Sequence, residues 1–161
     1  MNSNAGSYRY ASFRDSDREL HRLAEQAWVG RARERALLQR SGVEPGTRVL
    51  DLACGPGLVS QEIANLVGPG SVVGTDIDAG IIETARRLAS AAGIDNLDLV
   101  VDDIYASRLS PRSFDFVYAR LLFQHLQSPD RALPTIPQLL PPGGPLCLVA
   151  CDHGPVPPPP A

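Results

Sequence analysis

The feature that most constrains this chain is a regular alternation between short apolar runs and stretches with helical periodicity. Runs of about five residues separated by helices form βαβ units, which build a parallel sheet covered by helices on both faces. We therefore expect an α/β fold with a doubly wound, mostly parallel sheet. The expected strands cover residues 47–53, 71–76, 97–101, 114–119 and 145–151, and the expected helices cover residues 57–67, 79–92 and 128–140.

A further helix is expected before the first strand. Ser16 is a suitable N-cap, and Glu19 three residues later completes a capping box. Apolar residues then recur at helical spacing until Gly42, so the pattern predicts a helix over about residues 17–40. At the other end of the chain, the segment GPVPPPPA predicts an extended proline-rich tail that cannot join the interior of a sheet.

The loop after the first expected strand reads DLACGPG, residues 51–57, and places a carboxylate beside two glycines. In a doubly wound sheet, ligands bind beyond the carboxyl ends of the strands, where this loop would lie. Gly55 and Gly57 allow the backbone to bend and to approach a ligand closely. Asp76 ends the second expected strand, where a carboxylate accepts hydrogen bonds from ribose hydroxyls.

The charge of Asp51 indicates which ligand the loop suits. Two like charges several ångströms apart and partly shielded repel by a few kcal/mol, so Asp51 disfavours the pyrophosphate of a dinucleotide. The nicotinamide fingerprint is also incomplete, because Ser60 occupies its third glycine position. A ligand with an adenosine end and a cationic end would interact favourably with both Asp51 and Asp76.

Five motifs then resemble a known family. In order, VLDLACGPG, VVGTDID, LVVDDIY, FDFVYARLLFQHL and LLPPGGPLCLV are similar to the motifs of the class I S-adenosylmethionine-dependent methyltransferases, over about residues 41–152. A weaker likeness in RYASFRDSDRELHRLAEQ points to the branch related to the ubiquinone/menaquinone-biosynthesis C-methyltransferases. The resemblance implies a Rossmann-like fold, S-adenosylmethionine as cofactor, and O- or C-methylation of a small-molecule acceptor.

The same resemblance divides the chain into three parts. Residues 1–40 would form a lead-in and a helix that covers the cofactor cleft. Residues 41–153 would form the S-adenosylmethionine-binding domain, and residues 154–161 the proline-rich tail.

One group of residues is implied at the methionine end of the cofactor, whose ammonium and sulfonium are positive. Arg120, just past the fourth strand, would pair with the carboxylate of that end, although it could also be a surface residue at a helix start. Ala53 stands where the family more often has glycine, and alanine is tolerated there if its φ stays negative. The residues implied at this end are Asp51, Ala53, Cys54, Gly55, Gly57, Ala119 and Arg120.

A second group is implied at the adenosine end. Asp76 would bind the ribose hydroxyls, although such a residue can also be a helix N-cap. Asp102 and Asp103 are adjacent, so in an extended chain only one of them faces the cofactor, and the resemblance selects Asp103 for the adenine amino group. The residues implied at this end are Asp76, Ile77, Asp103 and Ile104, with Tyr10 and Gln26 as a cover.

Methyl transfer from a sulfonium is an in-line displacement, so much of its rate comes from orientation of the reacting groups. An oxygen or carbon acceptor can also need a base. His125 is our candidate, because it would lie near the mouth of the cleft if a helix starts at Arg120; a lone histidine in an apolar helix can equally be a packing or capping residue. Asp152 and His153, after the last strand, are further candidates.

The C-terminal part is expected to be incomplete, because five strands are visible of the usual seven in the resembled fold. The last strand, within LCLVAC, would be an uncharged apolar edge that invites pairing with a second copy or a partner chain. Pro134 and Pro137 fall within the helix expected at 128–140, where each would cost about 3 kcal/mol.

Composition excludes several other functions. The net charge of −3 and the pI of about 5.5 argue against nucleic-acid binding. Three cysteines without a CxxC pair or a His pair predict neither a disulfide framework nor a metal site, and a reducing cytoplasm is expected. The first thirty residues contain no apolar core of a signal peptide, and no apolar stretch is long enough to span a bilayer, so no membrane contact is expected.

Three functions are therefore carried forward. The preferred one is a methyltransferase. The second is a truncated, non-catalytic module that binds S-adenosylmethionine or S-adenosylhomocysteine and is completed by a partner chain. The third is an NAD-dependent oxidoreductase, which Asp51 and Ser60 disfavour.

Overall fold

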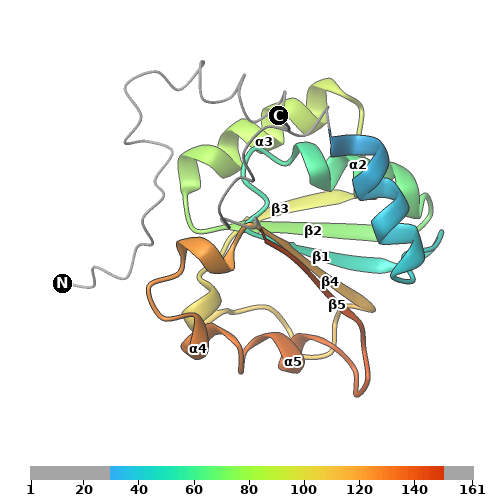
Figure 1. The fold of residues 1–161 in the computed structure, drawn as a ribbon. Coiled ribbons are helices and arrows are strands. Elements are labelled where there is room, and N and C mark those ends of the chain that lie inside the picture. Colours follow the sequence, from blue (N-terminus) through green and yellow to red (C-terminus); the bar gives the residue numbers. More distant parts are fainter. Residues whose placement is uncertain (1–29, 151–161) are drawn as a thin grey trace, which may run out of the picture.

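A computed structural model describes residues 30–150, and the fold in this range is a five-stranded parallel sheet. The strand order is β3-β2-β1-β4-β5, so the chain winds outward in one direction from β1 and then in the other (Figure 1). This confirms the expected doubly wound α/β fold. The strands are β1 (Arg48–Leu52), β2 (Ser71–Asp76), β3 (Leu97–Val101), β4 (Phe116–Arg120) and β5 (Leu146–Val149).

Helices cover both faces of the sheet, because successive side chains of a strand point to opposite faces and both faces carry apolar residues. A helix over residues 30–40, α2 (Leu58–Val67) and α3 (Ala79–Ala91) cover one face (Figure 1). Val49 and Phe116 point to that face and pack with Leu38 and Ile63. The short helices α4 (Pro129–Ala132) and α5 (Ile136–Leu139) lie on the other face, where Leu50, Leu52, Val117 and Ala119 pack with Ile136 and Leu139.

The helix expected over residues 128–140 is wrong in its continuity, because the structure has two separate turns, α4 and α5. Pro134 lies between them, where its ring has no N–H and would clash with the preceding turn of a continuous helix. Pro137 is tolerated because it lies in the first turn of α5. At the other end, the helix over residues 30–40 agrees with the C-terminal part of the helix expected over 17–40, and residues 17–29 lie outside the described range.

The register of the sheet places polar side chains together at its carboxyl end. Asp51 on β1 is the register partner of Tyr118 on β4, and Tyr118 is the partner of Cys147 on β5. Register partners in a parallel sheet point to the same face, and so does Arg120, two residues beyond Tyr118. Asp51, Tyr118 and Arg120 therefore face the helix over residues 30–40.

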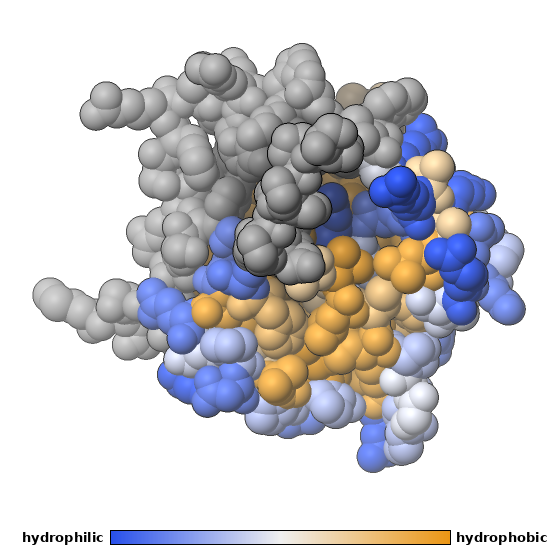
Figure 2. Space-filling view, viewed as in Figure 1, coloured by the Kyte–Doolittle hydropathy of each residue, from blue (hydrophilic) through white to orange (hydrophobic). Residues whose placement is uncertain are grey.

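β5 is the last strand of the described sheet and pairs with β4. Leu146 is 38% exposed and Leu148 is 47% exposed, and Figure 2 shows a band of apolar side chains in this region of the surface. Exposed apolar side chains on an end strand are typical of a surface that another chain covers. In residues 30–150, no helix combines the length and the apolar composition that a bilayer crossing requires.

Candidate cofactor site at the carboxyl ends of the strands

The loop between β1 and α2 turns sharply because three of its residues have left-handed backbones. Gly55 has φ 56° and Gly57 has φ 73°, which glycine adopts without strain. The loop is fastened to the neighbouring strand by the Cys54 amide, which donates to the Thr75 carbonyl at 2.8 Å. Gly57 precedes α2 as its N-cap residue, so the amides at the start of α2 follow the loop directly. This arrangement brings main-chain donors to the carboxyl end of the sheet.

Ala53 corrects one expectation, because its φ is +59° rather than negative. A non-glycine residue in the left-handed region costs on the order of 1–2 kcal/mol, because its Cβ approaches the following carbonyl. Ala53 therefore has the backbone conformation that glycine would adopt there, with the added strain of its Cβ. Strain of this kind persists where the surrounding structure determines the conformation, and it is frequent at binding sites.

Two glycines are packed so tightly against neighbouring side chains that a Cβ would not fit at either position. A Cβ on Gly57 would lie 3.1 Å from the Cβ of Ala85 on α3. A Cβ on Gly74, in the middle of β2, would lie 2.9 Å from a methyl carbon of Leu99 and 3.1 Å from both Cys54 Sγ and Ser60 Oγ. Sequence reasoning missed Gly74, because a glycine inside a strand was the only signal of this close approach.

Asp51 is buried beneath this loop, with 2% of its surface exposed. Ser60 Oγ donates to Asp51 Oδ2 at 2.6 Å. Burial raises the pKa of Asp51 to about 7, the Ser60 bond opposes this rise, and the charges of Glu34 and Asp76 add to it. Ser60, which occupies the third glycine position of the nicotinamide fingerprint, therefore has a role of its own, because its hydroxyl donates a hydrogen bond to the Asp51 carboxylate. Asp51 is a carboxylate that would gain from a nearby positive charge.

Asp76 connects the loop to the start of α3. Its Oδ2 accepts from the Gly55 amide at 3.1 Å, and its Oδ1 accepts from the Asp78 amide at 3.0 Å. Burial raises the pKa of this carboxyl, whereas the two amide bonds lower it. The N-cap of α3 is Asp78, whose side chain accepts from Gly80 and Ile81, so the helix-capping alternative for Asp76 is wrong.

The residues expected at the adenosine end lie on the loops after β2 and β3. Ile77 is 45% exposed and leaves an apolar surface available to a flat ring beside the partly buried Asp76. Asp102 is buried and accepts from the Arg108 amide at 3.0 Å, while the partly exposed Asp103 accepts from the Tyr105 amide at 2.9 Å. Ile104 begins the 3-10 turn η2 (Ile104–Ala106) and packs against the core.

The two residues expected beside the methionine tail, Ala119 and Arg120, both lie in β4, so the expectation that Arg120 comes just past this strand is wrong. Ala119 is 1% exposed and packs on the face covered by α5, so only its backbone could border the site. Arg120 points to the opposite face, and its Nε lies 3.3 Å from Glu34 Oε1. Tyr118 also donates its hydroxyl to Glu34 Oε1, and burial with the nearby Glu34 carboxylate raises the pKa of this tyrosine. The expectation that Arg120 could be a simple surface residue is wrong, and sequence reasoning missed Glu34.

His125 does not lie in a helix that starts at Arg120, so that expectation is wrong. Arg120 ends β4, Leu121 has φ 58°, and His125 closes the 3-10 turn η3 (Phe123–His125). Its Nε2 lies 3.1 Å from Gln124 Nε2, and its side chain is partly buried. The role of His125 as a base stays a prediction. Tyr10, Gln26, Asp152 and His153 lie outside the described residues.

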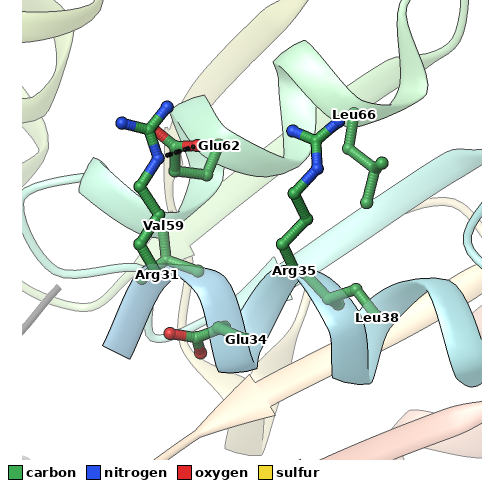
Figure 3. Close-up of a pocket in the computed structure, with 7 residues that line it drawn as sticks. All are labelled: Arg31, Glu34, Arg35, Leu38, Val59, Glu62 and Leu66. Atoms are coloured by element: carbon green, nitrogen blue, oxygen red, sulfur yellow. Dashed lines mark ion pairs between the residues drawn. The ribbon is translucent and has the colours of Figure 1, made fainter. Parts of the chain in front are cut away.

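A small groove lies between the helix over residues 30–40 and α2, and Glu34 is among the residues that line it (Figure 3). Arg31 and Glu62 form an ion pair across it at 2.7 Å, and Arg35 extends to the same side as Arg31. The space inside the groove is about 20 Å³, which holds about one water molecule and excludes a nucleoside. Within residues 30–150, no group of three or more His, Cys, Asp and Glu side chains is arranged to hold a metal ion.

The charges of the site suit a cation with a small anionic end. Three carboxylates, those of Glu34, Asp51 and Asp76, gather at the site, and one guanidinium, that of Arg120, lies near Glu34 and Asp51. Such a set disfavours a phosphate and favours an ammonium or sulfonium group, while Arg120 can pair with a carboxylate. Together with the left-handed glycines of the loop, the exposed Ile77 and the Asp76 carboxylate, these residues fit a cationic adenosyl ligand better than a dinucleotide.

Comparisons with known proteins agree with this geometry. Residues 49–144 match a family model described as a methyltransferase domain. A ubiquinone/menaquinone biosynthesis C-methyltransferase of Hahella chejuensis is 32% identical over 123 residues, which cover 75% of this chain and 49% of that protein. A ubiquinone biosynthesis O-methyltransferase of Xanthomonas campestris pv. campestris is 34% identical over 113 residues, or 69% of this chain and 46% of that protein.

The fold is shared with solved structures as well. The crystal structure of a SAM-dependent methyltransferase from Aquifex aeolicus superposes with a TM-score of 0.70 at 22% identity, over 78% of this chain and 69% of that one. The chain spans about half the length of the curated relatives described above. The match to the family model covers more than half of the sequence. The chain therefore belongs to the methyltransferase domain family, in the class I S-adenosylmethionine-dependent group.

Proposed function

We propose that this chain binds S-adenosylmethionine at the carboxyl ends of β1, β2 and β4 and directs methyl transfer to a small-molecule acceptor. The observation that carries the proposal is the buried Asp51 carboxylate beside the glycine loop, with Asp76 close enough to raise its pKa. A cationic cofactor offsets the mutual repulsion of these carboxylates, which no phosphate ligand would do.

Each part of the site has a role in this proposal. When bound, the cofactor supplies a methyl group activated on a sulfonium. Asp51 and the loop backbone at Ala53, Cys54, Gly55 and Gly57 hold its positive end. Asp76 accepts from the ribose hydroxyls, and Ile77, Asp103 and Ile104 surround the adenine. Cys54 contributes through its backbone, because its side chain packs with Ile82, Ala85 and Leu99.

The methyl acceptor is proposed to be a small aromatic or quinone-like molecule that is methylated at carbon or oxygen. The relatives named above are a C-methyltransferase and an O-methyltransferase of ubiquinone or menaquinone biosynthesis, which supports this class of acceptor. His125 is kept as the proposed base, since it lies one turn beyond the carboxyl end of β4. In this proposal, orientation of the acceptor supplies most of the rate.

Binding measurements test the proposal directly. Calorimetric titration with S-adenosylhomocysteine is expected to give saturable binding, whereas NAD is expected to give none, because its pyrophosphate would meet Asp51. Release of labelled methyl groups onto a set of phenols and quinones then separates an enzyme from a non-catalytic binding module. Tight binding of NAD without a response to S-adenosylhomocysteine would overturn the assignment.

We also propose that β5 pairs with a second copy of the chain or with a partner chain. The support is the exposure of Leu146 and Leu148 at the end of the sheet. Sedimentation at increasing protein concentration is expected to show self-association, and Leu148→Lys is expected to reduce it. A sharp monomer at high concentration would contradict association with a second copy.

A cytoplasmic location completes the proposal. The two cysteines in the described residues, Cys54 and Cys147, are free thiols. Free thiols are typical of proteins in a reducing compartment. We also keep residues 41–153 as the proposed extent of the cofactor-binding domain, a range that contains the residues matched by the family model.

A further inference from the structure

Glu34 lies outside the five strand and loop motifs, yet its carboxylate reaches the carboxyl end of the sheet. In Figure 3, Glu34 leaves the helix over residues 30–40 on a different side from Arg31 and Arg35. Only 11% of its side chain is exposed. One oxygen, Oε1, accepts from the Tyr118 hydroxyl and pairs with Arg120 Nε. A carboxylate with two partners on β4 and little exposure is part of the polar cluster at the end of the sheet and not a solvated residue on a helix surface.

Arg120 has two acidic neighbours that could compete for its guanidinium. It forms its ion pair with Glu34, and it lies close enough to Asp51 to lower the pKa of that carboxyl. Among residues 30–150, Glu34 is the acid that lies within ion-pair distance of Arg120. Because Asp51 and Tyr118 are register partners, Arg120, on the same face of β4, could otherwise turn toward Asp51.

We propose that Glu34 is a positioning residue of the cofactor site, which holds Arg120 away from Asp51 so that both remain available to the amino-acid end of the ligand. Because Glu34 pairs with Nε, the terminal nitrogens of the guanidinium can bind a carboxylate. Asp51 meanwhile is not paired with Arg120 and can receive the ammonium group. Without Glu34, Arg120 would pair with Asp51, and both recognition groups would be lost together. This inference rests on the proposed function.

Two ligands that differ in one part test the inference. S-adenosylhomocysteine carries the amino-acid end, whereas 5′-methylthioadenosine has the same adenosine and thioether without it. Glu34→Gln is expected to weaken binding of S-adenosylhomocysteine on the order of tenfold, the worth of a charge-assisted hydrogen bond. Binding of 5′-methylthioadenosine should be unchanged. Glutamine can still accept the Tyr118 hydroxyl, so the variant should keep its fold, which a thermal unfolding scan checks.

Two further variants separate positioning from other roles. In an Arg120→Gln background, Glu34→Gln is expected to have no further effect on S-adenosylhomocysteine, because Glu34 acts through Arg120. Glu62→Gln is the matched control, since it removes an ion pair between the same helix and α2 and should change neither affinity.

Four outcomes would overturn the inference. They are equal loss of both ligands in Glu34→Gln, no loss of either, a persistent effect of Glu34→Gln in the Arg120→Gln background, and the same selective loss in Glu62→Gln. If the unaltered protein binds neither ligand, the proposed function itself fails, which is a distinguishable result.

Discussion

Asp51→Asn is expected to weaken S-adenosylmethionine binding by about 10- to 100-fold at a pH near 8, because it removes a buried charge beside a cation. The same substitution is expected to stabilise the unliganded protein at that pH. The carboxylate is 2% exposed, and burial raises its pKa to about 7, so its charged form is costly in the folded state. Asparagine has a similar shape and can still accept the hydrogen bond of Ser60.

The pH dependence follows from the direction of this pKa change. Between about pH 4 and pH 7, the folded protein keeps a proton on Asp51 that the unfolded chain has lost, so the free energy of unfolding falls as the pH rises through this window. Above about pH 7 the full cost is present, on the order of a few kcal/mol. A cationic ligand favours the carboxylate, so its affinity should rise with pH up to about 7 and then level off.

Calorimetry and urea unfolding at several pH values check this expectation. The unaltered protein should bind S-adenosylmethionine more tightly at about pH 8 than at pH 5.5, and Asp51→Asn should remove most of that difference. Asp98→Asn is the control, because Asp98 is exposed on β3. An Asp51→Asn variant that binds the ligand with unchanged affinity and pH dependence would show that Asp51 does not face the positive end of the cofactor.

Gly74→Val is expected to destabilise the fold by about 2–3 kcal/mol and to weaken S-adenosylhomocysteine binding about tenfold or more. A Cβ at this position would already lie 2.9 Å from Leu99 Cδ2 and 3.1 Å from Cys54 Sγ and Ser60 Oγ. Valine adds two methyl groups to that contact, and it can gain space only by displacing Leu99 or the loop that carries Cys54. Displacement of the loop moves the backbone groups that the cofactor needs.

Gly68→Ala provides the control for Gly74→Val. Gly68 has φ 55° and ψ −105°, and a Cβ there would meet nothing within 4 Å, so alanine adds backbone strain on the order of 1–3 kcal/mol without a clash against a neighbouring side chain. Its cofactor affinity should be unchanged. Urea unfolding and calorimetry of both variants give the two quantities. Normal stability and affinity in Gly74→Val would mean that β2 and the loop are not packed as tightly as the structure shows.

Several features of this protein could be predicted from the sequence because they depend on local patterns. Apolar runs and helical periodicity predicted the five strands and the helices α2 and α3 to within a few residues, since burial on one or both faces requires those spacings. The order of the motifs predicted the family, and the charge of Asp51 together with Ser60 argued against a dinucleotide. The break between α4 and α5 was also visible in Pro134, although the sequence pattern around it still suggested one helix.

Other features required the tertiary structure, because they depend on which distant segments meet. Nothing local indicates that Ala53 has a left-handed backbone. The residues that follow it are held by distant partners, since the Cys54 amide donates to the Thr75 carbonyl and the Gly55 amide donates to Asp76. The tight contact at Gly74 arises only when β2 packs between the loop and β3.

The clearest case is Glu34, which reads in sequence as one charge on a polar helix. Glu34 and Tyr118 are 84 residues apart in the chain. The register of β1 with β4 and the packing of the helix over that face bring Glu34 to Tyr118 and Arg120. The sequence by itself determined the fold class and the chemistry of the ligand, since these follow from periodicity and from charge beside a glycine loop. The tertiary structure decided which charges pair at the site, because electrostatic partners are selected by distance in space rather than by position in the chain.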